Sequence, residues 1–119
     1  MKSKYFKRSE FACKCGCGFD VVDAELLQVL EDLRITMEEP LVINSGCRCA
    51  THNKNEGGAT SSLHMLGKAV DIRFNYKSKT PLSTLFDILI SKYPDKYGIA
   101  TEGSFVHLDV RPTKARWSY

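Results

Sequence analysis

The stretch Ser62-Leu63-His64-Met65-Leu66-Gly67-Lys68-Ala69-Val70-Asp71 places an imidazole and a carboxylate on either side of a glycine turn. Residues 69–74 alternate in polarity, which predicts a strand with Asp71 on the opposite face from Val70 and Ile72. Burying a carboxylate in an apolar strand is costly unless it has a partner. We therefore expect Asp71 to meet a cation or a hydrogen-bond donor.

A second strand pattern carries another imidazole, in Phe105-Val106-His107-Leu108-Asp109-Val110-Arg111. Alternation puts His107 and Asp109 on one face. A single histidine is ordinarily a surface or core residue, but two neutral histidines and one carboxylate are a common ligand set for catalytic zinc. The sequence predicts that His64, Asp71 and His107 bind one zinc ion. Such an ion polarises a carbonyl group and supports amide hydrolysis near neutral pH.

Two amphipathic patterns predict helices. The first begins after Asp23, a favoured N-cap, carries apolar residues at spacings of three and four, and ends before Pro40. The second begins at Thr80 and Pro81, a capping residue followed by proline at the first helical position, and ends before Pro94.

Short apolar or alternating runs predict the strands, at residues 41–43, 69–74, 97–101 and 105–111. Residues 44–60 are rich in Gly, Asn, Ser and Thr and predict a long polar loop, a feature that is usually functional. Together these elements predict an α+β fold, with two helices packed on one side of a small, mainly antiparallel sheet.

Size and charge narrow the class of protein. A chain of 119 residues predicts one domain over residues 1–119. The net charge of +3 is too small to indicate a nucleic-acid partner. No run is long enough for a membrane span, and the basic start has no apolar stretch after it, so we expect neither an anchor nor a secretion signal. The protein is therefore expected to stay in the cytoplasm where it is made, and to act outside the cell only if something else releases it.

Five cysteines, an odd number, argue against a complete disulfide framework. One alternative is a second, cysteine-bound zinc ion, but C-x-x-C is a commoner spacing than the C-x-C found here. We favour reduced thiols that hold the N-terminal loop near the loop of Cys47. The five cysteines are Cys13, Cys15, Cys17, Cys47 and Cys49.

The pattern Ser62-x-His64-x-x-Gly67-x-Ala69-x-Asp71 resembles the signature of the D-alanyl-D-alanine carboxypeptidase family of zinc peptidases. The resemblance covers nearly the whole chain and is nearest to the short phage and prophage branch. Further matching segments are Ser9-Glu10-Phe11, Leu33-Arg34, Ile43-Asn44-Ser45-Gly46-Cys47-Arg48, His52-Asn53, Gly57-Gly58 and Phe105-Val106-His107-Leu108-Asp109.

This resemblance implies a hedgehog-like α+β fold and zinc held by His64, Asp71 and His107. It also implies cleavage of peptidoglycan stem peptides, as by D-Ala-D-Ala carboxypeptidases or phage endolysins. Arg48 would stabilise the oxyanion, and Ser62 would hydrogen-bond the substrate or orient the site. His52 lies in an Asn- and Gly-rich loop, and we expect it to face the substrate or to stabilise this loop. A zinc-containing binding module or virion component on the same fold is the alternative.

The chain departs from the family at one position. Several members carry an acidic residue, the general base, three positions before the second histidine ligand, where this chain has Ser104. A serine is a poor base because its pKa lies far from neutral. The remaining candidates are Glu102 and Asp109. We favour Asp109, which shares a strand face with His107 and would reach either the nucleophilic water or a ligand imidazole.

Overall fold

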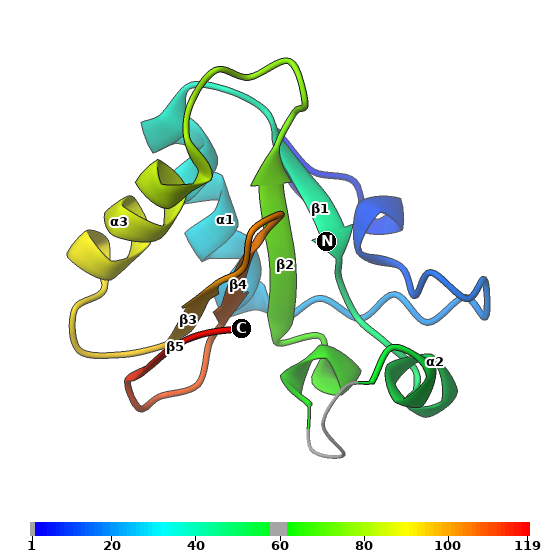
Figure 1. Cartoon of the computed structure of the whole chain (residues 1–119). Coiled ribbons are helices and arrows are strands. Elements are labelled where there is room, and N and C mark those ends of the chain that lie inside the picture. Colours follow the sequence, from blue (N-terminus) through cyan, green and yellow to red (C-terminus); the bar gives the residue numbers. More distant parts are fainter. Residues whose placement is uncertain (1, 58–61) are drawn as a thin grey trace.

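The computed structural model describes residues 2–57 and 62–119, which form a five-stranded sheet with helices packed against it (Figure 1). In chain order the elements are η1 (Arg8–Phe11), α1 (Ala24–Met37), β1 (Leu41–Ser45), α2 (Ala50–Asn55), η2 (Leu63–Leu66), β2 (Ala69–Phe74), α3 (Leu82–Lys92), β3 (Gly98–Thr101), β4 (Val106–Asp109) and β5 (Ala115–Ser118).

The strand order is β1-β2-β4-β3-β5. All neighbouring strands pair antiparallel except β3 and β5, which are parallel. The predicted α+β class is confirmed. The parallel strand β5 was not predicted, because the tail in which it lies is basic and has no long apolar run. Within the described residues, no helix is long and apolar enough to cross a membrane.

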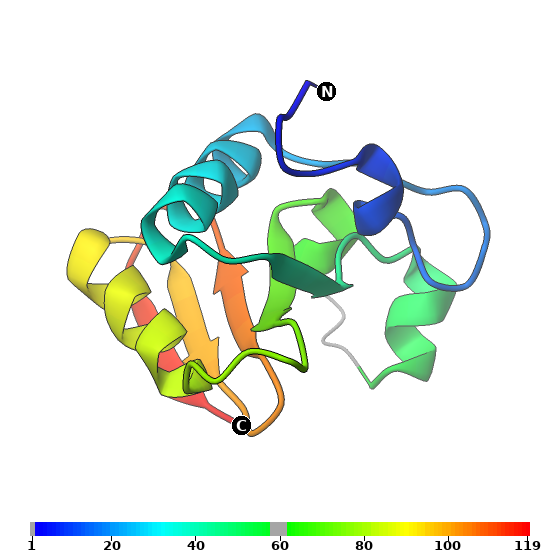
Figure 2. The same ribbon diagram turned by 90° about the horizontal axis from the view of Figure 1, so that it is seen from above.

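The two longer helices, α1 and α3, lie on the same side of the sheet (Figures 1 and 2). Their buried leucines pack against the apolar face of β2, β3 and β4. Alternation along β2 and β4 therefore turns the intervening residues to the face that these helices leave open. The core residues involved are Leu26, Val29, Leu30, Leu33, Leu85, Leu89, Val70, Ile72, Ile99, Val106 and Leu108.

Helix starts follow local hydrogen bonding. The Asp23 carboxylate accepts hydrogen bonds from the backbone N–H groups of Glu25 and Leu26, at 2.9 and 3.1 Å, as predicted for an N-cap. Helix α3 begins one residue later than predicted, with Pro81 as the N-cap. The Thr80 hydroxyl instead donates to Glu39 Oε2 at 2.7 Å, which ties the start of α3 to the end of α1.

The prediction of a continuous loop over residues 44–60 is wrong for Ala50–Asn55, which form α2, and for residues 44 and 45, which extend β1. Residues 58–60 lie outside the described part of the chain. The N-cap of α2 is Cys49, whose sulfur accepts the His52 N–H at 3.4 Å. Cysteine is not a usual capping residue, so the start of α2 carries no recognisable sequence signal.

Candidate functional site

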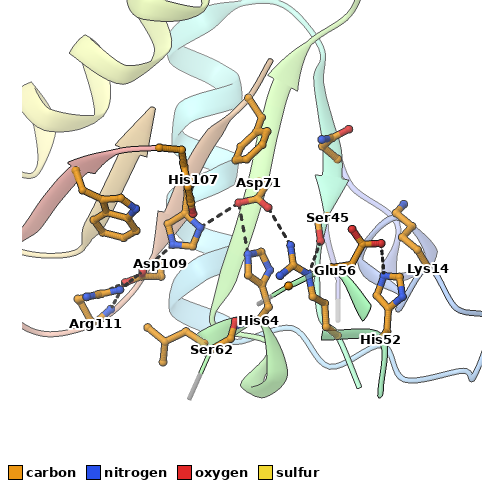
Figure 3. A pocket seen from close by; sticks show the side chains of 17 residues that line it. Lys14, Ser45, His52, Glu56, Ser62, His64, Asp71, His107, Asp109 and Arg111 are labelled. Atoms are coloured by element: carbon orange, nitrogen blue, oxygen red, sulfur yellow. Dashed lines mark hydrogen bonds and ion pairs between the residues drawn. The ribbon is translucent and has the colours of Figure 1, made fainter. Parts of the chain in front are cut away.

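The open face of the sheet brings together the three predicted metal ligands. Asp71 in β2 stands directly opposite His107 in β4. Asp71 Oδ1 lies 3.0 Å from His107 Nδ1 and 3.4 Å from His64 Nε2 (Figure 3). All three side chains are buried, and their ligand atoms lie within 4.8 Å of one another. Three donors of these types in one place can hold a divalent metal ion.

A backbone carbonyl orients His64. The short helix η2, which carries this residue, begins at Ser62, whose hydroxyl accepts the His64 N–H at 3.2 Å, and ends at Gly67 with φ 67°. The ring Nδ1 lies 2.7 Å from the carbonyl oxygen of Gly46. Because a carbonyl only accepts hydrogen bonds, Nδ1 carries a proton, so Nε2 is the nitrogen that faces Asp71 and, in the neutral ring, the one that can bind a metal ion.

A carboxylate orients His107 in the same way. His107 Nε2 donates to Asp109 Oδ2 at 2.8 Å, so Nδ1 is the nitrogen that faces Asp71. Asp109 is fully buried. It accepts two hydrogen bonds from the Arg111 guanidinium, each 2.7 Å long, and further ones from the Arg111 N–H at 3.3 Å and the Gly98 N–H at 3.1 Å. Outer partners of this kind fix the tautomer and the direction of a ligating imidazole.

Hydrogen bonds keep both carboxylates ionised. Burial alone would raise the pKa of Asp71, but hydrogen bonds with His107 and His64 lower this pKa to about 2. Burial would also raise the pKa of Asp109, but hydrogen bonds with His107 and Arg111 outweigh this effect and hold the pKa well below the usual range. Burial would lower the pKa of His107, yet its bonds to Asp109 and Asp71 raise it. This face of the sheet therefore favours positive charge between its carboxylates.

Arg48 lies beside the three candidate ligands. Its Nη2 is 3.3 Å from Asp71 Oδ2, and its other nitrogens donate to Ser45 Oγ at 3.1 Å and Asn53 Oδ1 at 3.4 Å. These contacts hold the guanidinium in one place at the edge of the site.

A cavity of about 840 Å³ opens over this cluster. Its lining includes the three candidate ligands, Ser62, His52 and Asp109 (Figure 3). Arg48 is also a lining residue. His52 Nε2 lies 3.7 Å from Glu56 Oε1, another lining residue. The cavity therefore brings together every predicted site residue except Glu102, which is not among its described lining residues.

Glu102 is held in the β3–β4 turn instead. Its carboxylate accepts hydrogen bonds from the Ser104 N–H at 3.0 Å and from the Ser104 hydroxyl at 2.5 Å. These bonds lower the pKa of Glu102. A carboxylate with a lowered pKa, turned towards its own loop, is poorly suited to accept a proton from a substrate or from water.

Sequence reasoning missed one wall of the cavity, which the tail supplies. Trp117, in β5, lies with its ring centroid 5.1 Å from that of His107, and the Arg111 guanidinium lies 5.1 Å from the Trp117 ring centre. Tyr119 follows Trp117 on the same wall and contacts the Phe105 ring. The spacing of the two tail aromatics, two residues apart, was the available signal for a strand with one aromatic face.

The comparison with protein families adds one finding. A family model described as Peptidase M15 matches residues 4–109. The match includes all three candidate ligands and Arg48. No curated protein shows significant similarity to the chain.

Proposed function

Because the chain belongs to the M15 peptidase family, a family of zinc peptidases, we propose that it hydrolyses peptide bonds in peptidoglycan stem peptides with the help of one zinc ion. The observation that carries this proposal is the convergence of His64, Asp71 and His107 in the lining of a large cavity. Their donor set, two imidazoles and a carboxylate, is a recognised one for catalytic zinc because it leaves a position open.

The observed distances suit such an ion. Donors about 2.0–2.2 Å from a tetrahedral zinc lie about 3.3–3.6 Å from one another. The Asp71 oxygen is 3.0 Å from His107 Nδ1 and 3.4 Å from His64 Nε2, so small shifts would admit the ion. Bound there, zinc would supply Lewis-acid polarisation of the scissile carbonyl and a nucleophile at neutral pH.

The protein's own side chains would stabilise the oxyanion and orient a metal ligand. Arg48 would donate hydrogen bonds to the oxyanion that develops on the scissile carbonyl, since its guanidinium is already held beside the ligands by Ser45 and Asn53. Asp109 would act as a positioning residue. It accepts a hydrogen bond from His107 Nε2, and its hydrogen bonds with Arg111 keep the carboxylate anionic. Of the two carboxylates considered for proton transfer, Asp109 lines the cavity and Glu102 does not, but the lowered pKa of Asp109 suits it to orient His107 and not to accept a proton.

The cavity also supports the choice of substrate. Stem peptides carry free carboxylates, and the described lining includes the cations Lys14, Arg48 and Arg111. An aromatic wall formed by Phe105, Trp117 and Tyr119 offers apolar contact for the side chains and methyl groups of such a peptide. Ser62 and His52, at the rim, would contact the peptide backbone. Activity would be exerted at the cell wall, after release from the cell, as in phage or prophage lysis.

The test is mass spectrometry of purified peptidoglycan fragments incubated with the protein. We expect shortened stem peptides, with cleavage abolished by a chelator and restored by zinc. Release of D-alanine alone would identify a carboxypeptidase, and internal cleavage an endopeptidase. A folded, zinc-loaded protein that cleaves no fragment from several wall types would overturn the proposal and favour the non-catalytic binding module.

A further inference from the structure

A second group of potential ligands lies outside the site described above. The loop after η1 approaches the start of α2 (Figure 2), and four cysteine sulfurs gather where they meet. Cys13 Sγ lies 3.4 Å from Cys15 Sγ and 3.8 Å from Cys49 Sγ, and the Cys15 and Cys49 sulfurs are 3.6 Å apart. With Cys17, all four sulfurs lie within 4.8 Å of one another.

These separations match a metal-centred tetrahedron. Sulfurs about 2.3 Å from a zinc ion lie about 3.8 Å from one another. A disulfide requires about 2.05 Å, and all five cysteines are free thiols. The sulfurs of Cys13, Cys15 and Cys49 therefore already form a face of a zinc–thiolate tetrahedron, and Cys17 lies within reach as the fourth ligand.

Two glycines explain how a C-x-C-x-C sequence brings its sulfurs together. Gly16 and Gly18 have φ of 83° and 88°, in the left-handed region that favours glycine. A Cβ at either position would contact nothing within 4 Å, so the backbone turn, not crowding, is the reason for glycine there. The loop closes through the Cys13 N–H, which donates to the Phe19 carbonyl at 2.7 Å.

Two of the cysteine sulfurs already accept hydrogen bonds from backbone N–H groups. The Cys49 N–H lies 3.4 Å from Cys13 Sγ, and the His52 N–H lies 3.4 Å from Cys49 Sγ. Donors of this kind stabilise thiolate ligands and fix their direction. The fifth cysteine behaves differently, because buried Cys47 donates its S–H to the Phe19 carbonyl at 2.9 Å and is not part of the cluster.

We propose that Cys13, Cys15, Cys17 and Cys49 bind a second zinc ion, whose role is structural. Four protein ligands close the coordination shell, so this ion would have no position for a substrate. It would join the N-terminal loop to α2, two segments that supply residues to the cavity. Lys14 lies between two of the ligands and lines the cavity, and Arg48 directly precedes Cys49.

The test is metal content per chain, measured on protein prepared under reducing conditions, together with absorption spectra after cobalt substitution. We expect two zinc ions in the wild type and a thiolate-to-cobalt charge-transfer band. Cys15→Ser and Cys17→Ser, at exposed positions, should each lose one zinc ion and this band. Cys47→Ser is the matched control and should keep both. His107→Ala should lose one zinc ion but keep the band.

A wild type with one zinc ion and no thiolate band would overturn the proposal. So would a Cys15→Ser protein with unchanged metal content, or a Cys13–Cys49 disulfide found by mass spectrometry in the reduced preparation. Circular dichroism of each variant would distinguish loss of a ligand from loss of the fold. Because these measurements do not use catalysis, they are independent of the peptidase assay.

Discussion

Asp71 and His107 face each other across two antiparallel strands, and the carboxylate of one lies 3.0 Å from the imidazole of the other. Both residues are therefore fixed by the hydrogen-bond ladder of the sheet, and neither relies on a mobile loop. Only His64, from η2, comes from outside the sheet, and its ring is held by the Gly46 carbonyl. A site built on paired strands should bind its metal with little rearrangement.

We expect Asp71→Asn to abolish hydrolysis and to weaken zinc binding at the histidine site by at least 10–100-fold, the loss typical even of outer partners of a metal. The substitution removes a charged ligand and leaves Arg48 without its anionic partner. Competition with a chromogenic chelator would measure the affinity. Asp87→Asn, at an exposed position of α3, is the control and should bind zinc as the wild type does.

Replacing Arg48 should separate catalysis from metal binding. Arg48→Ala should lower kcat by about 10²–10³-fold, as loss of an oxyanion donor does, with a smaller change in KM. Zinc content should stay at the wild-type level, because Arg48 is not a ligand. Arg8→Ala is the control, since Arg8 lies in an exposed ion pair with Asp20 and is not among the described lining residues of the cavity. A wild-type kcat for Arg48→Ala would remove this residue from the mechanism.

Asp109 and Glu102 can be distinguished by a pair of substitutions. Asp109→Asn should lower both activity and zinc affinity by about 10–100-fold, because the His107 ring loses the acceptor that orients it. Glu102→Ala should leave both unchanged. The dependence of activity on pH adds a further readout. In Asp109→Asn, which lacks the orienting carboxylate, the pH at which activity falls on the acid side should differ from that of the wild type, in addition to the lower activity at every pH. Equal effects of the two substitutions would contradict these assignments.

The metal-free protein should lose stability in acid. The pKa of Asp71 is lowered in the folded state to about 2. Its contribution is therefore present above the unfolded-state pKa of about 3.9 and is lost as pH falls towards 2. We expect a loss of about 2 kcal/mol in the free energy of unfolding between about pH 4 and pH 2. Urea titrations at several pH values would measure it, and Asp71→Asn should show a smaller change.

The raised pKa of His107 acts in the opposite sense. In the metal-free protein its contribution is fully present below the unfolded-state pKa of about 6.5 and is lost as pH rises through the higher folded-state pKa. Zinc requires the neutral ring, so zinc affinity should increase over the same rise in pH. Calorimetry in buffers of different ionisation enthalpy should detect proton release on zinc binding. Binding without proton release would contradict this prediction.

Gly98 should tolerate no side chain. A Cβ there would overlap both carboxylate oxygens of Asp109 and the Arg111 guanidinium. We expect Gly98→Ala to lower the free energy of unfolding by about 1–3 kcal/mol, as overpacking does, and to weaken zinc binding through His107. Gly103→Ala is the matched control, because a Cβ at that turn position meets nothing within 4 Å. Thermal melts with and without zinc would compare the two.

Much of the candidate site was predictable because it depends on strand alternation. The pattern in residues 69–74 and 105–111 was enough to put Asp71, His107 and Asp109 on one face, where the structure has them. Both predicted helices were also found, as α1 and α3, but α2 lies in a segment that was predicted to be a loop. That helix was missed because its cap is a cysteine sulfur, whose role depends on the fold around it.

What could not be predicted depends on contacts between distant residues. The thiols of Cys13 and Cys49 are neighbours because their two segments meet, where the Cys47 N–H donates to the Phe11 carbonyl at 2.9 Å. From the spacing we favoured reduced thiols that hold the N-terminal loop near the loop of Cys47, and not a metal site. Likewise, β5 pairs parallel with β3 through a connection that local patterns do not specify, so the aromatic wall of the cavity was missed.

Gly46 performs two tasks with main-chain atoms alone. Its carbonyl accepts a hydrogen bond from His64 Nδ1. Its Cα packs so closely on the Phe11 backbone that a Cβ at position 46 would overlap the Phe11 backbone. The orientation of the His64 ring thus depends on how the segment around Phe11, more than thirty residues before Gly46 in the chain, packs against Gly46. Natural variants that loosen Phe11 would impair the metal site while leaving every ligand intact, and a survey of active-site residues would not reveal why.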